Sequence, residues 1–111
     1  MKTMKQFPCS YLKGVVELTD ERFKHIAESH PDFLPEHEGK IPEVLADPDQ
    51  IRRSHRFPNA LMFTRWFTNL NGGKFVVIVV VTDSPPTQRS WIVTGYIARK
   101  IKEGEVEWKR S

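Results

Sequence analysis

The sequence contains a single cysteine, Cys9, among its 111 residues. One cysteine excludes a disulfide within the chain and is typical of a protein in a reducing compartment, where a lone thiol is usually inert. No apolar run approaches the roughly 20 residues of a membrane-spanning helix, and residues 1–5 are not followed by the apolar segment of a secretory signal. We therefore expect a cytoplasmic protein with no membrane partner.

The sequence also lacks the common signatures of cofactor and metal binding. It has no Walker loop, no dinucleotide-binding glycine fingerprint and no paired-cysteine zinc pattern. A metal site of His25, His30 and His37 is conceivable, but the first two are five residues apart. On a helix that spacing turns one side chain about 140° from the other, so one metal ion cannot easily take both. We expect neither a cofactor nor a metal.

The charge is uneven along the chain, although the net charge is only +3. Residues 17–50 hold 10 acidic and 3 basic side chains, whereas residues 51–111 hold 11 basic and 4 acidic ones. A basic half suggests an anionic partner such as nucleic acid. The alternative is internal compensation, in which an acidic helical layer lies beside a basic sheet. The sequence leaves both interpretations open.

The length of the chain is that of one domain. Residues 1–12 are polar and show no sustained period, so we expect a flexible N-terminal arm followed by a single domain over residues 13–111. Thr19, followed by Asp20 and Glu21, predicts a helix that runs to about His30, and residues 41–46 predict a second short helix.

The rest of the chain is rich in β-branched and aromatic residues, which indicate strands. A short strand is predicted at 14–18, and others at 50–55, 60–67, 75–82, 90–99 and 106–108. Helices that precede an antiparallel run of strands predict an α+β fold. We expect N-terminal helices packed on a four- to five-stranded antiparallel sheet.

Two stretches carry candidate site residues. In the first helix, Phe23, Ile26, Ala27 and His30 share one stripe at about 100° per residue, so His30 should be carried toward the core at the helix end. A core histidine bonded to a carbonyl is the simpler interpretation of His30 alone.

The second stretch is the strand at 90–99, where Gly95 leaves room for a close approach to the backbone. Strand alternation places Trp91, Val93 and Ile97 on one face, and Ile92, Thr94, Tyr96 and Lys100 on the other. The second set would offer two hydroxyls and an amine to a cleft. A partly buried strand with hydroxyls on its wet side is the simpler interpretation.

Several motifs, in order along residues 14–108, resemble those of a known nuclease family. They are Leu18-Thr19-x-Glu21-Arg22-x-x-His25-Ile26-x-x-x-His30-Pro31, Pro48-Asp49-x-Ile51, Lys74 before a valine-rich strand, and Val93-Thr94-Gly95-Tyr96. The chain resembles phage- and toxin-associated domains of the barnase–EndoU–colicin–RelE-like nuclease superfamily. The resemblance implies helices before a four-stranded antiparallel sheet and a metal-independent ribonuclease activity. It further implies RNA as substrate, and a neutralising antitoxin or immunity protein as a partner.

Cleavage of RNA without a metal requires a base for the 2′-hydroxyl, an acid for the leaving 5′-oxygen and donors for the phosphate. Histidine suits the first two roles and cations or hydroxyls the third. The candidate catalytic residues are His30, His25, Thr94, Tyr96 and Lys74. The candidate RNA-binding residues are Arg22, Arg52, Arg53, Arg65, Arg99 and Lys100. Which histidine is the base stays open, and the alternative function is an inactive module of the same fold that binds nucleic acid or protein.

Overall fold

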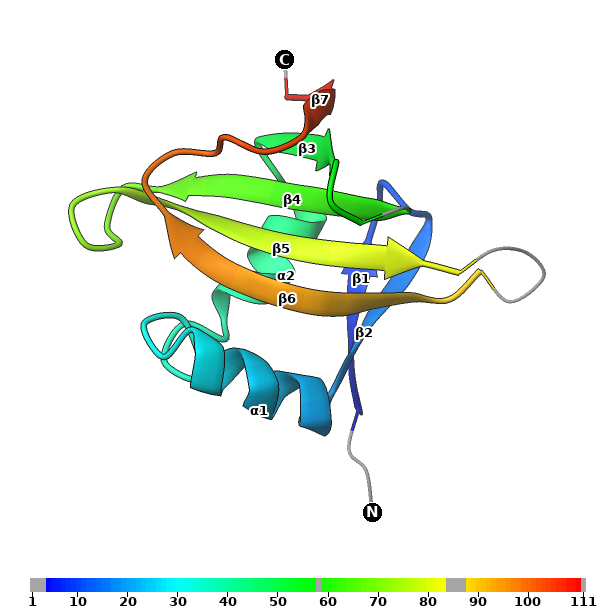
Figure 1. Ribbon diagram of the computed structural model, residues 1–111, viewed down its shortest axis with the longest axis horizontal. Helices are drawn as coiled ribbons and strands as arrows, with labels where there is room; N and C mark the ends of the chain where they lie inside the picture. Colours follow the sequence, from blue (N-terminus) through cyan, green and yellow to red (C-terminus); the bar gives the residue numbers. More distant parts are fainter. Residues whose placement is uncertain (1–3, 58, 84–87, 111) are drawn as a thin grey trace.

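A seven-stranded sheet forms the body of the protein in the computed structural model, which describes residues 4–57, 59–83 and 88–110 (Figure 1). Two helices, α1 (Asp20–Ser29) and α2 (Lys40–Ala46), lie between the second and third strands along the chain. The strands are β1 (Met4–Cys9), β2 (Gly14–Thr19), β3 (Gln50–Arg53), β4 (Ala60–Phe67), β5 (Lys74–Thr82), β6 (Ser90–Ala98) and β7 (Glu105–Lys109). They lie side by side in the order β1-β2-β6-β5-β4-β3-β7.

The expected fold is wrong in its sheet. The sequence predicted a four- to five-stranded antiparallel sheet under the helices, but the described residues form seven strands, and β2 pairs with β6 in parallel. Strands β3 to β6 do form an antiparallel run. The β1–β2 hairpin extends this run on one side, and β7 returns to extend it on the other. Outer strands pair through backbone hydrogen bonds, which need no hydrophobic pattern in the side chains, so the pattern did not reveal the whole sheet.

Strand β1 falls within residues 1–12, the segment for which the sequence suggested a flexible arm. It pairs with β2 along its whole length. Its side chains are mostly exposed, apart from the half-buried Phe7 and the buried Cys9, which contact the core. Pro8 has no N–H to donate, and it is tolerated because β1 lies at the edge of the sheet.

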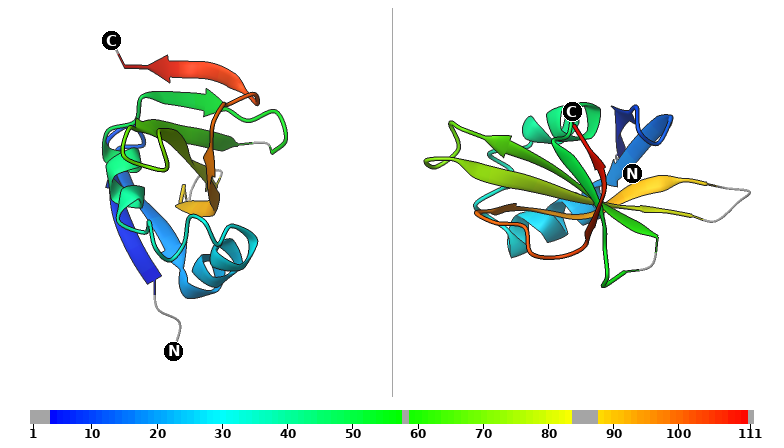
Figure 2. Two further views of the ribbon diagram at one scale, coloured as in Figure 1. Left: turned by 90° about the vertical axis from the view of Figure 1, so that its left-hand side faces the viewer. Right: turned by 90° about the horizontal axis from the view of Figure 1, so that it is seen from above.

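The main core lies on one face of the sheet, which we call the helix face. Helix α2 packs over this face, and α1 lies beside the edge of the sheet at β6 and adds Ile26 to the same core (Figure 2). The helices and the loop between them contribute buried apolar side chains, namely Ile26, Phe33, Leu34, Ile41, Val44 and Leu45. The sheet contributes Val16, Leu18, Ile51, Leu61, Phe63, Val76, Ile78, Val80 and Ile92. Full burial of side chains of this size stabilises the fold by about 1.5–3 kcal/mol each.

The opposite face of the sheet, which we call the second face, has a smaller core. It consists of Ala60, Met62, Val77 and Val79, and no helix residue belongs to this described cluster. Residues 99–104 connect β6 to β7, and we call this segment the crossover. Its Ile101 packs against the small core, so the crossover covers only part of the second face.

A β-bulge in β6 changes which side chains share a face. Val79 pairs with Thr94, but the next residue of β5, Val80, pairs with Ile92, so Val93 is an extra residue in the ladder. Strict alternation had placed Ile92 on the face of Thr94 and Tyr96, and this prediction is wrong. Ile92 lies in the core of the helix face. The bulge therefore separates Ile92 from the hydroxyls that follow it.

Helix α1 begins and ends as the sequence predicted. Thr19 is its N-cap, and the Thr19 hydroxyl accepts a hydrogen bond from the backbone N–H of Arg22 at 3.1 Å. The C-cap is His30, whose N–H donates to the carbonyl of Ile26 at 2.7 Å. Among the described residues, neither helix is long and apolar enough to cross a membrane.

Candidate functional site

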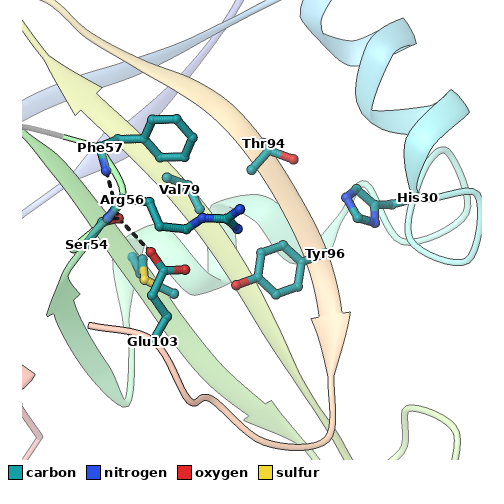
Figure 3. A pocket seen from close by; sticks show the side chains of 9 residues that line it. His30, Ser54, Arg56, Phe57, Val79, Thr94, Tyr96 and Glu103 are labelled. Atoms are coloured by element: carbon teal, nitrogen blue, oxygen red, sulfur yellow. Dashed lines mark hydrogen bonds between the residues drawn. The ribbon is translucent and has the colours of Figure 1, made fainter. Parts of the chain in front are cut away.

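A cleft of about 360 Å³ opens on the second face of the sheet (Figure 3). Its apolar floor is formed by Met62 and Val79, which belong to the small core. The remaining lining residues are polar or aromatic: His30, Ser54, Arg56, Phe57, Thr94, Tyr96 and Glu103. They come from the end of α1, the β3–β4 loop, strand β6 and the crossover. Segments far apart in the sequence therefore meet around one hollow.

One wall of the cleft forms where the end of α1 meets β6. Strand β2 pairs with β6 only at Ser90 and Trp91, so no described strand occupies that edge of β6 beyond the bulge. The end of α1 reaches this free edge. The rings of His30 and Tyr96 lie 5.7 Å apart between centroids, with their planes tilted by 36°. The residue that ends α1 thus lines a cleft on the second face, although the buried side chain of α1, Ile26, belongs to the core of the helix face.

The loop that follows α1 holds His30 in this place. The backbone N–H of Phe33 donates to the carbonyl of His30 at 3.0 Å. The Phe33 ring is fully buried and lies against Gly95 of β6, where a Cβ on the glycine would come within 2.9 Å of the ring. The sequence analysis noted room for a close approach to the backbone at Gly95. In the structure the Phe33 ring of the protein's own core occupies this room.

Ser54 organises the opposite wall. Its hydroxyl accepts hydrogen bonds from the backbone N–H groups of Arg56 at 3.1 Å and Phe57 at 3.3 Å, and it donates to the Glu103 carboxylate at 2.9 Å. This buried hydroxyl joins the β3–β4 loop to the crossover. Figure 3 shows the Arg56 guanidinium directed across the cleft toward Thr94 and Tyr96. The side chain of Arg56 has no acidic partner within the described parts of the chain.

The crossover is fixed by Arg52 of β3. The Arg52 guanidinium donates to the backbone carbonyls of Glu103 at 3.2 Å and Gly104 at 3.4 Å. The backbone around Glu103 is thereby held, while the carboxylate is held by Ser54. Glu103 enters the cleft from a fixed position.

The environment of Tyr96 favours its neutral phenol. Burial raises the pKa of Tyr96, the Glu103 carboxylate raises it further, and the Arg56 guanidinium opposes the rise. Tyr96 is therefore a neutral hydroxyl donor at physiological pH. The negative Glu103 and the positive Arg56 thus have opposite effects on the pKa of the same phenol.

The predicted catalytic residues are divided by the structure. His30, Thr94 and Tyr96 line one cleft. His25 is exposed on α1 and is not part of the lining. Lys74 begins β5, where its amine donates to the carbonyl of Asn71 at 2.5 Å, and it does not line the cleft either.

Three of the six predicted RNA-binding side chains make contacts within the protein. Arg53 pairs with Glu107 at 2.8 Å, and Arg65 pairs with Asp47 at 3.2 Å. Arg52 holds the crossover. These three guanidinium groups are therefore engaged in the fold itself.

The other three predicted RNA-binding side chains are divided between two places. Arg22 lines a separate hollow of about 380 Å³ beside α1 and β6. Arg99 and Lys100 are exposed at the start of the crossover, and neither has an acidic partner among the described residues. Arg56 thus brings unpaired positive charge into the cleft, while Arg99 and Lys100 bring it to the end of β6 that is in register with Phe75.

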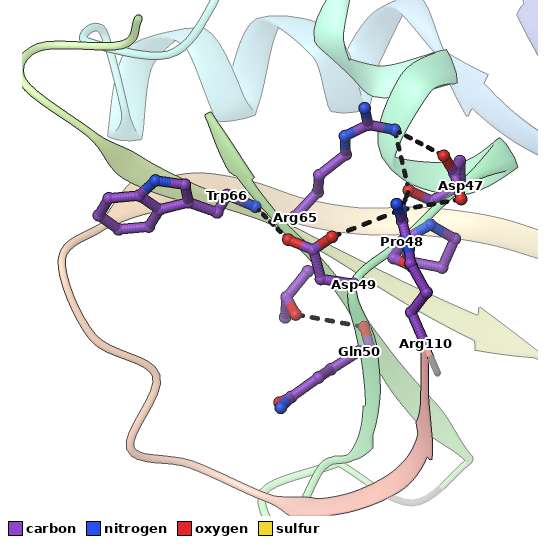
Figure 4. Close-up of polar contacts among 8 residues, drawn as sticks. Asp47, Pro48, Asp49, Gln50, Arg65, Trp66 and Arg110 are labelled. Atoms are coloured by element: carbon purple, nitrogen blue, oxygen red, sulfur yellow. Dashed lines mark hydrogen bonds and ion pairs between the residues drawn. The ribbon is translucent and has the colours of Figure 1, made fainter. Parts of the chain in front are cut away.

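Ion pairs compensate part of the uneven charge along the chain. Asp47 and Asp49 of the acidic stretch pair with Arg110 at 2.8 and 3.4 Å, and Asp47 also pairs with Arg65 (Figure 4). Arg89 and Glu17 form another pair between the two stretches, and Lys5, which precedes both, pairs with Glu38. Among the described residues, internal compensation, one of the two interpretations of the sequence, therefore accounts for three basic residues of 51–111, namely Arg65, Arg89 and Arg110.

The sequence interpretation missed Arg56, Glu103, Ser54 and Phe57. All four lie in connections between strands, where no hydrophobic period marks a residue as inward-facing. The sequence signal for them is weak: Ser54 falls within the strand predicted at 50–55, Arg56 and Phe57 follow that strand, and Glu103 stands between two predicted strands.

Comparison with known proteins assigns no relative to the chain: no family model, no curated protein and no solved structure matches it. In the described part of the chain, no group of three or more His, Cys, Asp or Glu side chains could hold a metal ion. The interpretation of the cleft therefore depends on its own residues.

Proposed function

We propose that the protein is a metal-independent endoribonuclease of toxin or phage type. The observation that supports this function is the convergence of His30, Thr94, Tyr96, Arg56 and Glu103 around one open cleft. These side chains include two that transfer protons and three that donate hydrogen bonds to a phosphate. They are the groups that cleavage of RNA by its own 2′-hydroxyl requires.

The roles follow from the chemistry of each side chain. A carboxylate accepts a proton, so Glu103 takes the proton of the 2′-hydroxyl as this oxygen forms its bond to phosphorus. The bond from phosphorus to the 5′-oxygen breaks, and the His30 imidazolium gives that oxygen a proton. The products are a 2′,3′-cyclic phosphate and a 5′-hydroxyl. His25 has no part in this assignment, which replaces the pair of histidines suggested by the sequence.

The remaining groups stabilise the phosphate as negative charge accumulates. A guanidinium makes strong, charge-assisted hydrogen bonds to phosphate oxygens, so Arg56 takes this role. The Tyr96 phenol, kept neutral by its raised pKa, and the Thr94 hydroxyl are further donors. The buried free thiol of Cys9 suits a reducing compartment, and the proposal includes a cytoplasmic location. A neutralising antitoxin or immunity protein would act by covering this cleft.

The test is an RNA cleavage assay in the presence of EDTA. A positioned acid or base contributes about 10²–10⁴-fold in rate, so His30→Ala and Glu103→Gln should each lower the cleavage rate by that order. His25→Ala is the matched control, because His25 is exposed on the same helix, and it should cleave as fast as the wild type. A substrate with one 2′-deoxy nucleotide should resist cleavage at that nucleotide. Equal losses in His25→Ala and His30→Ala would contradict the assignment.

A second candidate is an inactive module that binds RNA or protein through the same region. The exposed, unpaired Arg99 and Lys100 favour it, because they can bind phosphates without any proton transfer. Binding to RNA that weakens steeply with salt, without cleavage by the wild type, would favour this module. Cleavage that depends on His30 would exclude it.

A further inference from the structure

Trp66 is a large aromatic side chain on the second face that the protein leaves exposed. It lies near the end of β4, and 42% of it is accessible to solvent. Its ring packs edge-on against Phe75, its partner on β5, with 4.9 Å between centroids. A side chain at Gly73 would lie 2.5 Å from the indole, so only glycine leaves room for the ring. The indole is thus held in one position with part of its surface open.

The register of the sheet places Trp66 close to the cleft. Trp66 pairs with Phe75, while Tyr96 pairs with Val77, two residues further along β5. Two strand spacings of about 4.8 Å and a two-residue step of about 6.6 Å separate the backbones of Trp66 and Tyr96 by about 12 Å. Both side chains belong to the second face, since Phe75 and Tyr96 pack on the same small core. A short extended ligand in the cleft can therefore reach the indole.

The charge near Trp66 favours a polyanion. Ala98 pairs with Phe75, so Arg99 and Lys100, which follow it, lie at the same end of the sheet as the indole. Both are exposed and have no acidic partner among residues 4–57, 59–83 and 88–110. The nearby Asp49 carboxylate accepts the backbone N–H of Trp66 at 2.7 Å and is paired with Arg110. Figure 4 shows the indole directed away from that carboxylate.

We propose that Trp66 is a second binding site for RNA, on which one base of a single strand stacks while a neighbouring phosphodiester lies in the cleft. This inference rests on the proposed function, because it takes RNA as the ligand of the cleft. Base stacking needs an exposed base face, which a duplex hides between its neighbouring base pairs. The substrate is therefore single-stranded, and Arg99 and Lys100 bind its backbone at the end of the sheet where the indole lies.

The test uses the fluorescence of Trp66 alone. The chain has three tryptophans, so the double variant Trp91→Phe, Trp108→Phe leaves only Trp66. A 2′-O-methyl octanucleotide of mixed sequence lacks the nucleophile and binds without being cleaved. Its addition should quench Trp66 in a saturable manner, and the same octanucleotide in a duplex should quench it far less.

The matched control is Trp66→Phe, Trp91→Phe, which leaves only Trp108. Trp108 pairs with Ile51, whose side chain belongs to the helix-face core, and its ring contacts Tyr11. Trp108 therefore lies on the opposite face of the sheet from the proposed site, and its fluorescence should not change when the octanucleotide is added. Stacking contributes enough that Trp66→Ala should weaken octanucleotide binding roughly 5- to 150-fold. Trp66→Phe should retain most of the affinity. A dinucleotide, too short to span both sites, should bind the wild type and Trp66→Ala equally.

The outcomes separate this proposal from the nuclease proposal. Quenching of Trp66 by a single strand, without cleavage of any RNA by the wild type, would support the stacking site and overturn the nuclease. Cleavage by Trp66→Ala, with octanucleotide affinity equal to that of the wild type, would overturn the stacking site and leave the nuclease standing. Equal quenching by single strand and duplex, or none by either, would also overturn the stacking site.

Discussion

Replacing Gly95 by alanine tests how tightly the core on the helix face is packed against β6. A Cβ at Gly95 would lie 2.9 Å from the Phe33 ring and 3.1 Å from the Ile78 side chain, and both of these residues are fully buried. Overpacking of this kind costs about 1–3 kcal/mol. Removing a glycine from a strand returns about 0.5–1 kcal/mol. Because the closer contact is with a fully buried ring, the cost should lie in the upper half of that range, about 2–3 kcal/mol. The free energy of unfolding of Gly95→Ala should therefore fall by about 1–2.5 kcal/mol.

Thermal unfolding measures this loss directly. At about 2.1 cal/mol/K per residue, the unfolding entropy of a 111-residue chain makes a loss of about 1–2.5 kcal/mol equivalent to a fall in Tm of roughly 4–11 °C. Gly14→Ala is the matched control, because Gly14 also lies in a strand but its nearest neighbouring atom would be 4.0 Å from the new carbon. Its Tm should be unchanged or slightly raised.

A second background sharpens the test. Ile78→Val removes the carbon atom that lies 3.1 Å from the position of the new Cβ, so Gly95→Ala should cost less in that background than in the wild type. A Gly95→Ala protein as stable as the wild type would refute the view that the Phe33 ring fills the space beside Gly95. Such a result would also remove the packing of Phe33 on Gly95 as a reason for the position of His30.

Two further predictions concern the helix start and the cleft. Thr19→Ala should lower the free energy of unfolding by about 1 kcal/mol in a urea melt, because the backbone N–H of Arg22 loses its acceptor. Thr19→Ser should keep most of the stability, and equal melts for the wild type and both variants would contradict the role of Thr19 as N-cap. In a Tyr11→Phe background, absorbance titration should give Tyr96 a pKa above its ordinary 10.0, and Glu103→Gln should lower it toward that value. Because the pKa of Tyr96 is higher in the folded than in the unfolded protein, its contribution to stability should be complete below pH 10 and lost as the pH rises above 10. A pKa of Tyr96 at or below 10.0 would contradict the burial of the phenol.

Local patterns in the sequence predicted the helices and the central strands. Thr19 and the acidic residues after it specify the start of α1 through interactions within one helical turn. The continuous apolar run of β5 predicts a strand covered on both faces, and Val76 to Val80 are all buried. These features depend on neighbours in the chain, which a sequence displays.

The sheet order and the bulge depend on distant contacts, which a sequence does not display. Nothing in the polar side chains of β1 predicts that its backbone pairs with β2, or that β2 pairs in parallel with β6. Val93 is the extra residue of the bulge, and Gly95, two residues further along, is the nearest glycine that could signal it. Alternation was therefore applied across the bulge and misplaced Ile92.

The candidate site divides in the same way. The stripe on α1 and the alternation after the bulge were enough to suggest His30, Thr94 and Tyr96. Arg56 and Glu103 could not be suggested, because the Ser54 hydroxyl brings their two connections together across 49 residues of sequence. Arg53 and Arg65 were suggested by charge alone, and carboxylates of the same domain pair with both.

The part of the sheet that the sequence did not predict is also what makes the cleft accessible to α1. A parallel strand that paired with all of β6 would fill its outer edge and keep α1 away from the second face. Strand β2 pairs with only two residues of β6 and then diverges, and α1 follows directly from the end of β2 (Figure 1). The free edge beyond the bulge admits the loop after α1, where Phe33 packs against Gly95 and His30 reaches Tyr96. The short parallel pairing, rather than the antiparallel run, thus determines where a histidine from the helix face can meet the hydroxyls of the second face.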